Sequence, residues 1–196
     1  YWHKKPLLIR NAVPNFAGLL SPAEMQTLAR RDDVESRLVQ GQGRRWRLDH
    51  GPFRAADFKR LPKTSWTLLV QSLNHHLPAA DALLRRFDFV PQARLDDLMV
   101  SYAVPGGSVG PHFDSYDVFL LQGSGRRRWR IGAQTDLACL PDAPLKILRR
   151  FEPEEEWVLE PGDMLYLPPR IAHHGVGVDA CTPYSIGFRA PSAEEL

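Results

Sequence analysis

Cysteine is scarce in this chain of 196 residues, which contains only Cys139 and Cys181. Two cysteines make neither a disulfide framework nor a thiolate metal site, so a cytoplasmic location is the default expectation. Long hydrophobic runs are also missing: none reaches the roughly 18 residues that a membrane span needs, and none of signal-peptide length opens the chain. We therefore expect no membrane partner. The first residue is not Met, which leads us to expect a processed or trimmed product.

The sequence also lacks a strong net charge, since its 25 Lys and Arg residues face 23 Asp and Glu residues. This balance does not predict a dedicated DNA-binding protein. The charge is nevertheless uneven, because residues 1–98 carry 16 basic against 10 acidic side chains and residues 99–196 carry 9 against 13. We interpret the basic half as a solvated surface, with contact to RNA or to an acidic partner as the alternative.

The composition that is present, 43% hydrophobic and 24% charged, is that of a globular protein with a real core. In the first half, Ser21-Pro22-Ala23-Glu24 is a capping box with proline at the first helical position. This box and the apolar spacing further along predict short helices over residues 22–31, 57–61, 66–77 and 79–87. Residues 1–97 are thus expected to form a mainly helical portion that packs on the rest of the chain.

The pattern changes near residue 98, where short apolar runs separated by Pro/Gly turns begin. The runs are LMVSYAV, DVFLLQ, RRWRIG, EWVLE, MLYLP, HGVGV and PYSIGF. Short strands at this spacing are typical of an antiparallel sandwich or jelly roll. The predicted fold class is mainly β with N-terminal helices (α+β), with residues 98–191 as the β core.

The tripeptide His112-Phe113-Asp114 and the later His173 form a candidate metal site. Residues two apart on an extended chain point the same way, so His112 and Asp114 can reach one ion. Two imidazoles and one carboxylate are the facial triad of non-haem Fe(II) oxygenases, which leaves positions for a bidentate 2-oxo acid and for O₂. A structural role for each histidine is the alternative. His174 competes with His173, and we place the ligand at His173 because two neighbours on a strand face opposite ways.

The basic run around Arg127 contains one arginine that strand parity turns inward. Arg127 shares a face with the apolar Trp129 and Ile131, whereas Arg126 and Arg128 lie on the other face. An inward arginine needs an anionic partner, and the distal carboxylate of 2-oxoglutarate supplies one. A solvated basic face is the alternative interpretation of this run.

Several segments of the chain resemble one known family. They are SVGPHFDSYDVFLLQGSGRRRWRIG, LEPGDMLYLPPRIAHHG and YSIGFRAP, and SRLVQ, HGPF, WTLLVQSLNHH and RLDDLMVSYAVPGG are similar to that family's N-terminal part. The chain is thus similar over nearly its whole length to the bacterial ribosomal oxygenases. These are JmjC-type enzymes with a cupin fold, the double-stranded β-helix.

The resemblance implies an enzyme that uses Fe(II), 2-oxoglutarate and O₂ to hydroxylate the β carbon of an arginine in large-subunit ribosomal protein number sixteen. The family's iron ligands fall on His112, Asp114 and His173, and its basic 2-oxoglutarate residue falls on Arg127. No catalytic residue is assigned beyond the metal ligands.

The same comparison places the family's substrate pocket on Asp97, Tyr116 and Ser185, and a 2-oxoglutarate contact on Tyr102. For Asp97 the alternative is a strand cap or a surface ion pair, and for Tyr116 it is core packing. An odd separation puts Asp97 and Tyr102 on opposite faces of a regular strand. Unless the strand contains a bulge, at least one of these two assignments fails.

Two other functions stay open. One is a related JmjC hydroxylase acting on histidine or asparagine of another protein, or on RNA. The other is a non-enzymatic cupin-like module that docks on the ribosome. Family members continue into a helical dimerisation region and a winged-helix-like domain, and Ser192–Glu195 is a capping box. Residues 192–196 are therefore expected to begin a truncated helical region, and the full-length protein to be a homodimer.

Overall fold

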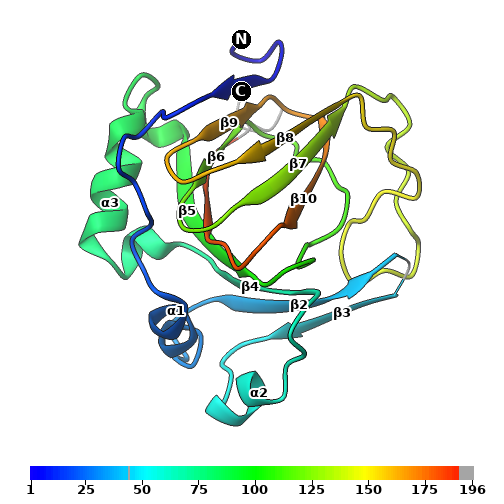
Figure 1. Ribbon diagram of the computed structural model, residues 1–196. Coiled ribbons are helices and arrows are strands. Elements are labelled where there is room, and N and C mark those ends of the chain that lie inside the picture. The colour runs from blue at the N-terminus through cyan, green and yellow to red at the C-terminus, as the bar shows by residue number, and fades with distance from the viewer. Residues whose placement is uncertain (44, 190–196) are drawn as a thin grey trace.

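The computed structural model describes residues 1–43 and 45–189. Within this part of the chain the strands form two antiparallel sheets, an eight-stranded sheet of order β1-β9-β6-β11-β5-β4-β2-β3 and a three-stranded sheet of order β10-β7-β8 (Figure 1). The strands are β1 (Leu7–Ile9), β2 (Ser36–Gln42), β3 (Arg45–His50), β4 (Trp66–Val70), β5 (Leu95–Ala103), β6 (Val118–Gln122), β7 (Arg127–Gly132), β8 (Glu155–Leu159), β9 (Met164–Leu167), β10 (Ala172–Gly177) and β11 (Pro183–Phe188). The helices are α1 (Pro22–Leu28), α2 (Ala55–Lys59) and α3 (Pro78–Leu84), with single 3₁₀ turns at Leu73–His75, Arg85–Phe87 and Gln92–Arg94.

The seven predicted strands of the second half, β5 to β11, are confirmed. They build a jelly roll in which the three-stranded sheet faces part of the eight-stranded one. Alternation along β6 shows how the faces divide: Val118 and Leu120 pack with Trp129 between the sheets, whereas Leu121 packs on the opposite side of the large sheet. The predicted fold class therefore follows from period-2 patterning in this half of the chain.

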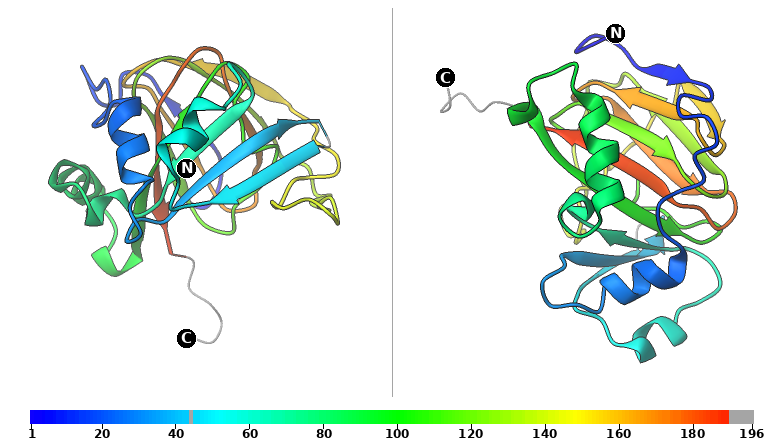
Figure 2. Two further views of the ribbon diagram at one scale, coloured as in Figure 1. Left: turned by 90° about the horizontal axis from the view of Figure 1, so that it is seen from below. Right: turned by 90° about the vertical axis from the view of Figure 1, so that its left-hand side faces the viewer.

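The prediction of a mainly helical N-terminal portion is wrong. Strands β2, β3 and β4 extend the large sheet, and with α1 and α2 they form the end of the molecule away from β1 (Figure 2). The predicted helix over residues 66–77 is strand β4 followed by a 3₁₀ turn. All five residues of β4 are buried between β2 and β5. A strand buried on both faces is a continuous apolar run, which periodicity does not distinguish from a buried helix.

The other three predicted helices are confirmed: α1 and α3 are shorter than predicted, and α2 begins and ends two residues earlier. Helix α1 begins at the capping box, in which the Ser21 side chain accepts from the Glu24 backbone and the Glu24 side chain accepts from the Ser21 backbone. The expected boundary at residues 97/98 falls inside β5, so this strand belongs to both expected portions. The helix expected at residues 192–196 lies outside the described residues.

The turn Pro161-Gly162-Asp163 anchors the N-terminal segment to the jelly roll. The Asp163 carboxylate accepts from the Asn11 backbone at 2.9 Å and from Arg10 Nη1 at 2.5 Å. Gly162 has φ +88, a left-handed conformation that favours glycine. No helix in the described residues is long and apolar enough to cross a membrane.

Candidate active site

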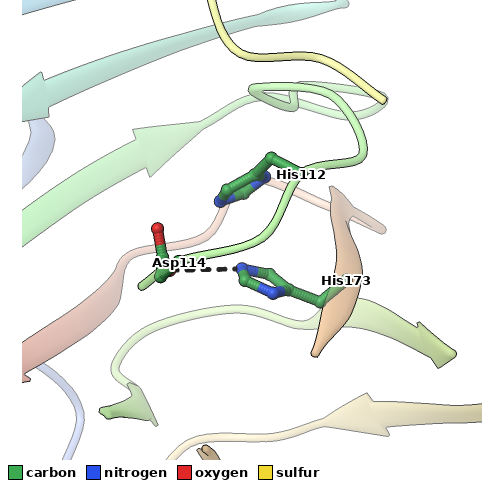
Figure 3. A group of neighbouring side chains, drawn as sticks. All are labelled: His112, Asp114 and His173. Atoms are coloured by element: carbon green, nitrogen blue, oxygen red, sulfur yellow. Dashed lines mark ion pairs between the residues drawn. The ribbon is translucent and has the colours of Figure 1, made fainter. Parts of the chain in front are cut away.

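Three side chains from two segments of the chain, His112 and Asp114 from one and His173 from the other, meet inside the jelly roll (Figure 3). One ligand atom from each of His112, Asp114 and His173 lies within 4.8 Å of the others. His173 Nε2 is 3.6 Å from Asp114 Oδ2, and the two imidazole centroids are 4.2 Å apart. Separations of this size allow one ion to be shared by all three, and two nitrogens with one carboxylate suit a divalent transition metal.

Backbone pairing holds the two histidines in place. His112 N donates to His173 O at 2.9 Å and His173 N donates to His112 O at 2.8 Å, which forms an isolated bridge outside the main ladders. Each Nδ1 lies 2.9 Å from a backbone oxygen, that of Gly110 for His112 and that of Ile171 for His173. An Nδ1–H donated to a carbonyl leaves Nε2 as the lone-pair atom, so both rings present the nitrogen that a metal needs.

The electrostatics of the site favour neutral imidazole at His173. Burial lowers its pKa well below the ordinary value, and the neighbouring His112 lowers the pKa further. A metal binds the neutral ring, so this lowered pKa favours the metal-binding form of His173. His174 lies on the other face of β10, against Phe151, and burial lowers its pKa to about 4. The predicted choice of His173 over His174 agrees with this geometry.

A cavity of about 280 Å³ opens from the three side chains into the jelly roll, and Arg127 lies in its wall. Arg127 is 3% exposed. Its Nη2 donates to Gly175 O at 2.9 Å, whereas Nε and Nη1 have no partner among the described residues. Burial lowers the pKa of Arg127, but a guanidinium does not lose its proton in a protein. The unpartnered N–H groups of this inward arginine suit an anionic ligand in the cavity.

Gly175 lies opposite this guanidinium and leaves room for it because glycine has no side chain. A Cβ added at Gly175 would lie 2.6 Å from Arg127 Nε and 2.6 Å from the Trp129 ring. The Trp129 ring in turn stacks under Arg127, whose Cζ lies 5.0 Å from the ring centroid. Outside the cavity, Arg128 pairs with Glu156 at 3.2 Å. Only the inward arginine of this run thus offers free donors to the cavity.

Of the predicted substrate residues, Asp97 on β5 and Ser185 on β11 belong to the eight-stranded sheet, and Tyr116 lies in the loop just before β6. Asp97, Tyr116 and Ser185 all line the cavity. A Cβ added at Gly187 would lie 3.6 Å from Asp97 Oδ1 and 3.9 Å from Tyr116 Cε2, so these groups border one space. Burial and the carboxylates of Asp114 and Asp97 raise the pKa of Tyr116, which keeps its hydroxyl protonated. This wall offers one carboxylate and two hydroxyl groups.

The structure does not bring Tyr102 to the cavity. Its ring packs edge-on against Trp66 at 5.5 Å on the other face of β5, whereas Asp97 and Ser101 line the cavity. The register of β5 against β11 does shift near Asp97, but the shift leaves Asp97 and Ser101 on the same side. The odd separation of Asp97 and Tyr102 therefore divides them, and only Asp97 reaches the site.

Several cavity residues are not predicted from the sequence, among them Arg37 and Gln71. Both belong to the part of the chain that was interpreted as helical, and Arg37 lies on β2 while Gln71 follows β4. The alternation in Arg45–His50, where Trp46 and Leu48 stand between polar residues, is the signal that predicts a strand in this hairpin. Once β2 is recognised as a strand, parity places Arg37 on the same side as Val39, which also lines the cavity.

Comparison with known proteins agrees with this geometry. A family model described as JmjC domain matches residues 82–196. The chain is 46% identical over 199 residues to the ribosomal protein uL16 3-hydroxylase of Escherichia coli K12, covering 100% of this chain and 52% of that protein. It is 43% identical over 201 residues to a probable ribosomal oxygenase of Haemophilus influenzae, covering 100% and 49%. The chain thus spans about half the length of these relatives.

Solved structures confirm the fold. An X-ray structure of E. coli YcfD has a TM-score of 0.92 at 44% identity and covers 100% of this chain and 52% of that one. A structure of YcfD, described as a ribosomal oxygenase in complex with cobalt and 2-oxoglutarate, has a TM-score of 0.88 at 44% identity and covers 99% and 50%. The predicted jelly roll and the resemblance to ribosomal oxygenases are both confirmed. Because the family model matches more than half of a chain whose strands build this fold, the chain belongs to the JmjC domain family.

Proposed function

We propose that this protein is an Fe(II)- and 2-oxoglutarate-dependent oxygenase that hydroxylates the β carbon of an arginine in ribosomal protein uL16. The observation that carries the proposal is a single cavity containing the His112–Asp114–His173 cluster, the orphaned guanidinium of Arg127 and the carboxylate of Asp97. The E. coli relative is named for 3-hydroxylation of uL16, and carbon 3 of an amino acid is its β carbon. A solved relative binds cobalt and 2-oxoglutarate.

In this proposal each group has one task. The cluster of His112, Asp114 and His173 holds the metal, and Arg127 binds the distal carboxylate of the co-substrate with Nε and Nη1. When bound, Fe(II) and 2-oxoglutarate supply the oxidation of an unactivated C–H bond by O₂. The protein contributes ligation and orientation, and burial of Arg127 removes competing water from the carboxylate.

The substrate end of the cavity fixes which carbon reacts. A guanidinium that bonds to Asp97 is held at one end of the arginine side chain, and the aromatic ring of Tyr116 and the hydroxyl of Ser185 border the same space. Charge-assisted hydrogen bonds of this type orient a side chain as well as bind it. Held in this way, the side chain presents its β carbon at a set distance from the metal cluster.

Mass spectrometry of a uL16 peptide tests the proposal directly. The protein is incubated with Fe(II), ascorbate, 2-oxoglutarate and an arginine-containing peptide of uL16, and fragmentation locates any added oxygen atom. Oxygen on an arginine β carbon supports the proposal. No product from this peptide, with oxygen added to a histidine or asparagine of another ribosomal protein, would replace arginine as the substrate. Absence of metal binding at 1:1 under anaerobic loading would favour a non-enzymatic module.

The remaining expectations about partners belong to the same proposal. Contact with ribosomal RNA, dimerisation through a further C-terminal region and a cytoplasmic location are predictions that follow from a ribosomal substrate and from the family resemblance. Density-gradient sedimentation with ribosomes, at low and at raised salt, measures the first of these.

A further inference from the structure

Asp97 is held by one of its two carboxylate oxygens. Oδ2 accepts from Gln71 Nε2 at 2.7 Å, from the Ser72 backbone N–H at 2.8 Å and from Ser72 Oγ at 3.5 Å. Oδ1 accepts no hydrogen bond from the described residues and faces the space beside Gly187 and Tyr116. The protein thus saturates one oxygen and leaves the other for a ligand in the cavity.

The orientation of Gln71 is itself fixed by a second residue. Arg37 Nη2 donates to Gln71 Oε1 at 2.7 Å, so the amide oxygen faces Arg37 and the amide nitrogen faces Asp97. Arg37 comes from β2, Gln71 follows β4 and Asp97 lies on β5, three neighbouring strands of the large sheet. The backbone of Ser72 has φ +50, an uncommon conformation for serine, which turns its N–H toward the carboxylate.

The neutral amide between the two charges has a chemical consequence. An arginine paired directly with Asp97 would neutralise the carboxylate and compete with a cationic ligand. Gln71 transmits the orientation set by Arg37 while it adds no charge of its own. Asp97 therefore keeps its negative charge for a cation in the cavity, at a fixed position and in a fixed plane.

We propose that Gln71 and Arg37 are positioning residues that hold Asp97 with Oδ1 free, and that this fixed carboxylate selects the planar guanidinium of arginine over the ammonium of lysine. The inference rests on the proposed function, since it concerns the same substrate side chain. A fixed acceptor at Oδ1, with the Ser185 and Tyr116 hydroxyls around the same space, suits donors spread over a rigid fork. A compact ammonium group reaches fewer of these acceptors at once.

The test compares variants in steady-state hydroxylation of two uL16 peptides, one with the target arginine and one with lysine in its place. Gln71→Leu keeps the size of the side chain and removes both hydrogen bonds. It is expected to raise KM for the arginine peptide about 10-fold, the loss typical of one hydrogen bond to a charged group, with kcat changed less than about twofold. The ratio of arginine to lysine kcat/KM should fall by a similar factor.

Variants of Arg37 keep the test valid if Gln71→Leu does not fold. Arg37→Met removes the donor to Gln71 and is expected to raise the arginine-peptide KM about threefold, because a fraction of the hydrogen-bond energy is lost when the amide rotates. Arg37→Lys retains a hydrogen-bond donor, so its KM for the arginine peptide should stay close to the wild-type value. Gln40→Leu is the matched control, since Gln40 lies on the same strand but does not line the cavity. Turnover of 2-oxoglutarate without peptide is measured in all four variants and should be equal in Gln40→Leu and in the wild-type protein.

Each result separates the two claims. If the wild-type protein does not hydroxylate the arginine peptide, the proposed function and this inference both fail. If the wild-type protein is active but Gln71→Leu keeps the wild-type KM and the wild-type preference for arginine, only the inference fails. Equal losses in peptide hydroxylation and in peptide-free 2-oxoglutarate turnover would mean that Gln71 supports the whole site, which also overturns the positioning role.

Discussion

The two sheets face one cavity but contribute opposite chemistry to it. The three-stranded sheet supplies His173 and Arg127, a neutral metal-binding ring and a buried cation with unpartnered N–H groups. The eight-stranded sheet supplies Asp97, whose carboxylate is already bound to Gln71 and Ser72 through one oxygen. In the first wall, N–H groups of Arg127 have no acceptor among the described residues, whereas in the second, hydrogen bonds within the protein already arrange the carboxylate of Asp97. The difference suits a deeply buried co-substrate on one side and a side chain of a large partner on the other.

A substitution in the metal cluster should give the largest effect of the variants that test this difference between the two walls. His112→Ala should lower the affinity for Mn(II) or Co(II) by more than about 100-fold, because loss of a group that only hydrogen-bonds to a metal ligand costs about 10- to 100-fold and a direct ligand contributes more. Isothermal titration under anaerobic conditions measures the affinity. His174→Ala is the control, since that ring lies on the other face of β10. Equal losses in both variants would mean that the cluster does not hold the metal.

Arg127 gives the next largest effect. Arg127→Met should weaken 2-oxoglutarate binding by about 100-fold, the loss of a desolvated charge-assisted pair worth about 3 kcal/mol, while metal binding is kept. Fluorescence or NMR titration of the Mn(II)- or Zn(II)-loaded protein measures this. Arg128→Met, which removes an outward cation paired with Glu156, should leave the affinity unchanged. If Arg128→Met also weakens binding, net charge rather than the buried guanidinium is responsible.

Asp97→Asn tests the prearranged wall. It should raise the KM for an arginine peptide about 10- to 30-fold, because a neutral amide replaces the charge that pairs with the guanidinium, and should leave 2-oxoglutarate affinity intact. Steady-state kinetics with both substrates varied separates the two constants. A loss of 2-oxoglutarate affinity of the same size would contradict the separation of the two walls.

The pH dependence of kcat/KM for the peptide tests the wall that contains Asp97. Burial raises the pKa of Asp97, and hydrogen bonds from Ser72 and Gln71 act against this rise. The ionised carboxylate binds the guanidinium, so kcat/KM for the peptide should be full above this pKa and fall as pH drops through it, earlier than for an ordinary aspartate. Asp97→Asn should flatten this limb. An unchanged acid limb in the variant would assign the titration to another group.

Tyr102 should give the smallest effect. Tyr102→Phe is expected to change 2-oxoglutarate affinity by less than about twofold, because the ring packs on Trp66 away from the cavity. The same titration that is used for Arg127→Met measures it. A loss as large as that of Arg127→Met would mean that Tyr102 reaches the co-substrate and that the face of β5 is misassigned.

Much of the jelly roll can be predicted from local patterns. Period-2 alternation and Pro/Gly turns give all of the strands from β5 to β11, and parity alone turns Arg127 inward. The hairpin β2–β3 and strand β4 are not predicted. Strand β4 is apolar on both faces because it lies in the middle of a sheet, and only its neighbours β2 and β5 distinguish it from a helix.

Local sequence patterns are enough to predict which side chains supply ligand and donor atoms to the cavity. His112 and Asp114 lie two residues apart, and His173 and Arg127 lie on strands whose alternation fixes their direction. How Asp97 is held depends on the tertiary structure, since Arg37, Gln71 and Asp97 come from three strands. The tertiary structure also shows which face of β5 enters the cavity, and Tyr102 lies on the other face. Side-chain direction along one strand follows from the local backbone geometry, so a few neighbouring residues are enough to predict it. A hydrogen-bonded chain across strands depends on which strands are neighbours and in what register, and this involves residues far apart in the sequence.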